Sequence, residues 1–255
     1  MPETMSNGSP GVGFFGKLPS HGDFLGRRLP RGFTDPWDRW LQTVIANSRE
    51  QLGSDWLDIY LTSPLWRFAL APGLCGDGAW CGLLMPSVDR VGRYFPLTLA
   101  VELQRDGNLL GLLASAEEWY QACEKLALGA LEDGFDLEAF DQALQGMAAP
   151  PLAATATRRT EPRSQRSAWH FEFGSLKQPG RAFSGVGQAL LERLFKGHAL
   201  WWTQGSERVQ PCLLITEGLP PVECFAALLD GQWAHWGWGD YRLPLAPADL
   251  TAQGQ

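Results

Sequence analysis

The chain has 255 residues, of which 45% are hydrophobic and 19% are charged, with a formal net charge of −7. This composition is typical of a globular protein with a sizeable core and excludes a disordered chain. The acidic balance also argues against nucleic-acid binding and against polybasic attachment to a membrane, because both need clustered positive charge.

The N-terminus and the cysteines indicate where such a protein works. Residues 1–11 read as a disordered leader, which has no Lys or Arg and leads into no apolar signal core. No run of 18 apolar residues is present, so we expect no membrane insertion and a cytoplasmic location. The cysteines are odd in number and lack CxxC spacing, so we expect reduced and mostly buried thiols. They are Cys75, Cys81, Cys123, Cys212 and Cys224.

The first predicted elements are, in order, a strand at 12–17, a Gly- and Pro-rich loop at 18–32 and a helix ending near residue 52. Thr34 or Asp35 can cap this helix, with Pro36 in its first turn. The apolar residues that follow keep the spacing of one buried helical face, and Gly53 is placed to end the helix.

Strands and two further helices are predicted next. Three short apolar runs, bounded by turn residues, predict an antiparallel meander at 65–70, 80–85 and 95–103. Ser115 with Glu118 forms a capping box for a helix to about Ala130. Asp136 can cap a shorter helix that ends near Gly146.

A change in composition separates the second half of the chain. Residues 148–167 are rich in Ala, Thr, Pro and Arg, and read either as a solvated basic loop or as a basic docking segment. The elements predicted beyond it are a strand at 168–173, a helix at 188–196, strands at 199–203 and 212–216, and a helix at 221–229.

This order of elements predicts an α/β (α+β) fold. We expect a largely antiparallel mixed sheet flanked by helices in a single compact globular unit. Residues 12–147 form its N-terminal core, and we expect residues 168–246 to be an α/β part packed on the same core.

Motifs for catalysis or cofactor binding are missing. The sequence has no GxSxG elbow, no phosphate-binding Walker loop and no HExxH. Residues 11–16 match GxGxxG as letters only, because these glycines precede and enter a strand rather than follow one. We therefore predict no enzymatic activity, no cofactor and no metal.

Two loops retain candidate residues. His21 and Asp23 could form an acid–base or metal pair, but a turn in which Asp23 accepts backbone N–H groups is the favoured interpretation. Residues 87–94 concentrate Asp and Arg between two predicted strands. They read either as a functional loop or as a hairpin in which Asp89 pairs with Arg90 or Arg93.

Several motifs in order resemble one family. They are GFFGKLPSHGDF at 13–24, WDRWL at 37–41, WRF at 66–68 and PSVDRVGRYFPL at 86–97. Together they resemble the TagF family, also called ImpM, over roughly residues 12–145. One departure is His21, where the family more often has Arg.

The resemblance implies an accessory regulator of bacterial type VI secretion. The resemblance further implies that it is a posttranslational repressor and that its partner is a cytoplasmic scaffold protein with a forkhead-associated domain. Some relatives carry a fused phosphatase domain, for which this chain has no room. The alternatives are a structural or chaperone-like secretion component, or a nucleotide-binding sensor that uses the Gly-rich loop as an anion nest.

The candidate partner-binding residues are polar and aromatic positions within these motifs that we expect to face solvent. They are Lys17, Ser20, His21, Asp23, Phe24, Arg67, Asp89, Arg90, Arg93 and Tyr94.

Overall fold

The computed structural model describes residues 11–104, 107–153, 179–239 and 241. Three expectations therefore fall largely or wholly outside the described residues: the leader, the basic loop and the strand at 168–173. None of the described helices is both long and apolar enough to cross a bilayer.

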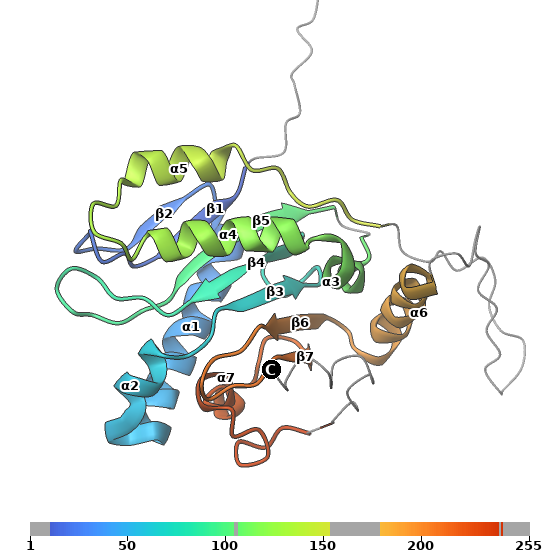
Figure 1. Ribbon diagram of the computed structural model, residues 1–255. Coiled ribbons are helices and arrows are strands. Elements are labelled where there is room, and N and C mark those ends of the chain that lie inside the picture. The colour runs from blue at the N-terminus through green and yellow to red at the C-terminus, as the bar shows by residue number, and fades with distance from the viewer. Residues whose placement is uncertain (1–10, 105–106, 154–178, 240, 242–255) are drawn as a thin grey trace, which may run out of the picture.

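The described strands form one antiparallel seven-stranded sheet in the order β2-β1-β5-β4-β3-β6-β7 (Figure 1). The strands are β1 (Gly13–Gly16), β2 (Leu25–Arg27), β3 (Trp66–Leu70), β4 (Ala79–Met85), β5 (Leu97–Leu103), β6 (His198–Thr203) and β7 (Cys212–Glu217). The predicted α+β class with an antiparallel sheet is confirmed.

Helices cover both faces of this sheet (Figure 1). The α-helices are α1 (Arg31–Leu52), α2 (Trp56–Leu61), α3 (Leu112–Ser115), α4 (Glu117–Gly129), α5 (Leu137–Gln145), α6 (Pro179–Leu194) and α7 (Ala227–Asp230). The described residues also include three short 3-10 helices, η1 (Gly53–Asp55), η2 (Leu109–Gly111) and η3 (Val222–Cys224).

The sheet separates two hydrophobic cores. Buried residues of α4, α5 and α6, such as Tyr120 and Leu144, pack on one face. Buried residues of α1, α2 and α7, such as Trp37 and Leu228, pack on the other. Along β5, Leu97, Leu99, Val101 and Leu103 belong to the first core and Ala100 to the second, because successive residues of a strand point to opposite faces.

The two halves of the chain share one sheet and form a single compact unit. Strand β6 pairs with β3 over four residues, so the second half extends the sheet of the first. On the α1 face, Trp201 of β6 stacks on Trp37 with ring centres 5.9 Å apart.

Several predictions of local structure were wrong. Helix α1 begins at Arg31 rather than at residue 34 or 35, because Pro30 holds the extended cap position and its carbonyl accepts from two of the first N–H groups. Pro36 consequently lies inside the helix. The loop at 18–32 contains strand β2, and the helix expected at 221–229 is divided into η3 and α7.

Of the caps predicted for the two middle helices, one was wrong and one is confirmed. The capping box was wrong, since α4 is preceded by Ala116 without a side-chain cap, and the Ser115 hydroxyl donates to the Gly111 carbonyl instead. The Asp136 cap is confirmed, because its carboxylate accepts from the backbone N–H groups of Glu138 and Ala139.

Candidate functional site

The two loops singled out in the sequence lie side by side at one end of the sheet. One loop, residues 17–24, joins β1 to β2, and the other, residues 86–96, joins β4 to β5. Strand β5 pairs with both β1 and β4, which brings the loops together. Gly16 fits this junction because its φ is +141° and a Cβ there would collide with the Pro96 carbonyl.

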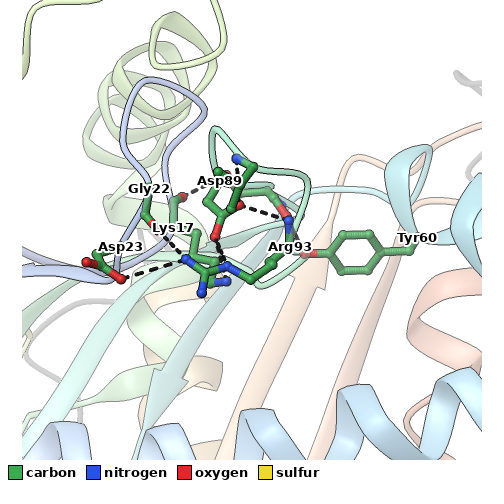
Figure 2. A network of polar contacts seen from close by, with 8 residues as sticks. Lys17, Gly22, Asp23, Tyr60, Asp89 and Arg93 are labelled. Carbon is green, nitrogen blue, oxygen red and sulfur yellow. Dashed lines mark hydrogen bonds and ion pairs between the residues drawn. The ribbon is translucent and has the colours of Figure 1, made fainter.

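A buried ion pair joins the loops. The Lys17 ammonium lies 2.8 Å from the Asp89 carboxylate, and both side chains are almost fully buried. Asp89 also accepts hydrogen bonds from the Arg93 side chain at 2.7 Å and from the backbone N–H groups of Val91 and Arg93 (Figure 2). Asp89 thus closes the hairpin through Arg93, as one interpretation of the sequence predicted, and it also holds the neighbouring loop.

These contacts keep Asp89 ionised. Burial alone would raise the pKa of its carboxyl, but the hydrogen bonds from Lys17, Arg93 and Val91 outweigh burial and hold that pKa well below its usual range. A carboxylate that is sealed and neutralised in this way holds structure together and is not placed to exchange protons with a substrate.

Further contacts fix the loops relative to each other and to α2. The Arg90 N–H donates to the His21 carbonyl at 2.9 Å, and the Arg93 guanidinium donates to the Gly22 carbonyl. The Tyr60 hydroxyl of α2 lies 3.0 Å from both the backbone N–H and the carbonyl of Ser87 (Figure 2). The loops are therefore a well-supported part of the fold.

The outer side of these loops forms a small mixed surface, which we call the two-loop surface. It consists of Asp23, Phe24, Arg90, Val91 and Arg93, all of which are exposed. Phe24 is 46% exposed and Val91 is 65% exposed. Val91 was not among the candidate residues, although an apolar side chain at a hairpin tip between arginines is a signal that could have been used.

Phe24 has a fixed orientation on this surface. Its ring stacks on Phe15 at 5.8 Å and meets Phe95 edge-on at 4.8 Å. The Lys17 ammonium lies 5.0 Å from the centre of the same ring. The exposed part of the ring is thus presented from a rigid base.

The two exposed arginines differ in their partners. Arg93 is bound to Asp89 and the Gly22 carbonyl, and its guanidinium lies 3.7 Å from the Asp23 carboxylate. The Arg90 guanidinium makes no hydrogen bond or ion pair with any described residue, while its backbone N–H is fixed by His21. Arg90 is therefore the cation of this surface that is left to pair with another molecule.

Three candidate residues do not face solvent, and that expectation was wrong. Lys17 and Asp89 are 5% and 3% exposed because each is the other's buried partner. Arg67 is 2% exposed and lies under α4, where it pairs with Glu117 and Glu124 at 2.7 Å. The structure therefore does not place Arg67 on the two-loop surface.

The remaining candidates flank this surface. Ser20 and His21 are half-buried, with the Ser20 hydroxyl 2.8 Å from the His21 ring nitrogen. Tyr94 is half-buried and meets Trp56 and Tyr60 of α2 edge-on. Asp23 lies 3.7 Å from the Arg93 guanidinium. Among the contacts of the described residues, it forms neither the alternative pair with His21 nor the favoured turn in which its carboxylate accepts backbone N–H groups.

The cysteines are free thiols, as predicted. Burial raises the pKa of Cys75 to about 12 and that of Cys212 to about 11, which keeps these thiols protonated. Within the described residues, no group of three or more His, Cys, Asp and Glu side chains is arranged to hold a metal ion.

Comparison with known proteins shows that both loops lie within a segment that matches a protein family. Residues 13–147 match the model of the TagF N-terminal domain, which is type VI secretion system-associated. The crystal structure of PA0076 from Pseudomonas aeruginosa PAO1 is similar, with a TM-score of 0.74 and 39% sequence identity. That alignment covers 92% of this chain and 98% of that chain. No curated protein matches the chain significantly.

Proposed function

Because this chain belongs to the TagF family of type VI secretion-associated proteins, we propose that it represses type VI secretion after translation by binding a cytoplasmic scaffold protein. The scaffold is one with a forkhead-associated domain that otherwise promotes assembly of the apparatus. On this proposal the protein acts by binding and not by catalysis, and it works in the cytoplasm.

The observation that supports this proposal is the two-loop surface. Its supporting residues, Lys17 and Asp89, are buried and bonded to each other, whereas Phe24, Val91 and Arg90 are exposed. Aromatic residues and Arg are enriched in protein interfaces relative to the rest of the surface. The surface is also built from sequence that lies within the family match.

Such a protein can repress assembly simply by binding the scaffold and so reducing the amount of free scaffold. A regulator that binds the free scaffold lowers the concentration available for assembly, and the shift depends on its concentration relative to the Kd. An interface of about 1,600 Å² is enough for a specific complex. The residues on the two-loop surface would form the centre of that contact.

The test is recovery of the scaffold from a cytoplasmic lysate with tagged wild-type and variant proteins. We expect the wild type to recover the scaffold and Arg90→Glu to lose it, because the Glu places a negative charge where the partner meets a cation. Lys125→Glu is the matched control, since Lys125 is an exposed cation on α4. Both variants should keep the wild-type Tm.

Arg93→Glu is a poorer variant for this purpose. The Arg93 side chain donates to Asp89 and to the Gly22 carbonyl, so its replacement disturbs the loops as well as the surface. Equal recovery of the scaffold by wild type and by Arg90→Glu would place the interface elsewhere. Failure of the wild type to recover it would contradict the proposed function.

A further inference from the structure

We infer that the two-loop surface recognises a segment of the partner that presents one carboxylate next to an apolar side chain. The carboxylate pairs with Arg90, and the apolar side chain packs on Phe24 and Val91. The inference rests on the proposed function and specifies the chemistry of the contact.

The charges of the two loops cancel in pairs and leave one cation. Lys17 pairs with Asp89 at 2.8 Å, and the Arg93 guanidinium lies 3.7 Å from the carboxylate of the exposed Asp23. The Arg90 guanidinium remains without a partner among the described residues. One unpaired guanidinium fits one carboxylate through two parallel hydrogen bonds.

The same count disfavours a phosphorylated partner. A phosphate group carries a charge of about −1.5 to −2 and is usually met by several cations. Here the second exposed guanidinium is already shared between Asp89 and Asp23, and the Asp23 side chain is 97% exposed. A dianion at Arg90 would be repelled by this exposed carboxylate, so a monoanion is the better match.

The apolar part of the surface is fixed before binding. Phe24 is held by Phe15 and Phe95, and Val91 sits at the hairpin tip next to the Asp89 carboxylate that accepts its N–H. Side chains that are already ordered lose little conformational entropy on binding. Exposed apolar groups on such a base gain free energy when a partner side chain removes them from water.

The experiment measures binding of the purified scaffold by titration calorimetry at two salt concentrations. We expect Arg90→Gln to raise Kd about tenfold or more and to weaken its salt dependence, because a charge-assisted pair is lost. Val91→Asp should also raise Kd, since it places a charge in the apolar part of the contact. Lys125→Gln, the control on α4, should leave Kd and its salt dependence unchanged.

A charge exchange makes the test specific. The scaffold's exposed Asp and Glu residues are replaced one at a time by Arg and tested against Arg90→Glu. We expect one replacement to weaken binding to the wild type and to restore binding to Arg90→Glu.

Three results would overturn the inference. If the scaffold binds the wild type and Arg90→Gln with the same Kd, the carboxylate contact is wrong although the proposed function stands. If phosphatase treatment of the scaffold abolishes binding, the anion is a phosphate. If the scaffold does not bind the wild type at all, the proposed function fails and the inference fails with it.

Discussion

His198, at the start of β6, is a buried imidazole whose surroundings favour its neutral form. It is 2% exposed, and its Nε2 lies 3.4 Å from the side-chain amide nitrogen of Gln188 on α6. That amide donates to Glu192 at 2.9 Å. Burial lowers the pKa of His198, and the nearby Glu192 carboxylate offsets this only in part.

Stability should therefore fall when the pH is lowered through the mildly acidic range. The unfolded chain takes up a proton at His198 near pH 6.5, whereas the folded chain does so only at lower pH. The loss begins near pH 6.5 and levels off below the folded pKa, with a slope of at most about 1.4 kcal/mol per pH unit from this group.

His198→Gln should remove this contribution, because Gln can still accept from Gln188 but does not titrate. Denaturant unfolding between pH 7.5 and 5.5 measures the difference. His235→Gln is the control, as His235 is exposed. Equal pH dependence for His198→Gln and the wild type would contradict the assignment.

The roles of individual charges could be predicted from the sequence only where the partner is close along the chain. Asp89 and Arg93 are four residues apart, and their pairing was one of the two interpretations of the hairpin. The partner of Lys17 is 72 residues away, and Glu117 lies 50 residues beyond Arg67. Burial of Lys17 and Arg67 therefore depends on tertiary structure, which local patterns do not encode.

At the scale of elements, the caps predicted at Ser115 and Asp136 make a matched pair. The Asp136 carboxylate accepts from two N–H groups at the start of α5. We expect Asp136→Ala to lower the free energy of unfolding by about 1 kcal/mol, because those donors lose their acceptor. Chemical denaturation of the purified protein measures this loss.

Ser115→Ala serves as the control for this prediction. The Ser115 hydroxyl donates to the Gly111 carbonyl and caps no N–H group of α4. Its removal should change stability by less than about 0.5 kcal/mol, as expected for an exposed position. If Ser115→Ala lowered the free energy of unfolding as much as Asp136→Ala, Ser115 would act as a helix cap after all, contrary to the structure.

Elements with a strong periodic pattern could be predicted, and short ones in irregular sequence could not. Strands β3, β4 and β5 were predicted because each is a short apolar run bounded by turn residues. Strand β2 is three residues long and lies in a Gly- and Pro-rich stretch, so its pairing with β1 sets its conformation. Helix α2 is six residues long, and it packs through Trp56 and Tyr60.

At the scale of the whole molecule, the C-terminal part completes structure that the family-matched segment begins. Trp40 and Trp66 donate their indole N–H groups to the carbonyls of Pro220 and Leu228, each at 3.0 Å. Trp201 is fully buried against the α1 face of the sheet. The sequence predicted that the two parts pack on one core, but not that β6 would pair directly with β3.

A fragment ending at Ala153 should therefore fail to fold alone. Without β6 it exposes the edge of β3 and the aromatic residues of α1 that Trp201 covers, and an apolar strand edge promotes aggregation. We expect aggregates on size-exclusion chromatography and loss of the near-UV signal of packed Trp residues. Co-expression with residues 154–255 should restore a soluble complex, because the missing strands return to the sheet. A monomeric fragment with cooperative unfolding would instead show that the matched segment is an independent domain, and that the second half adds to a fold already complete.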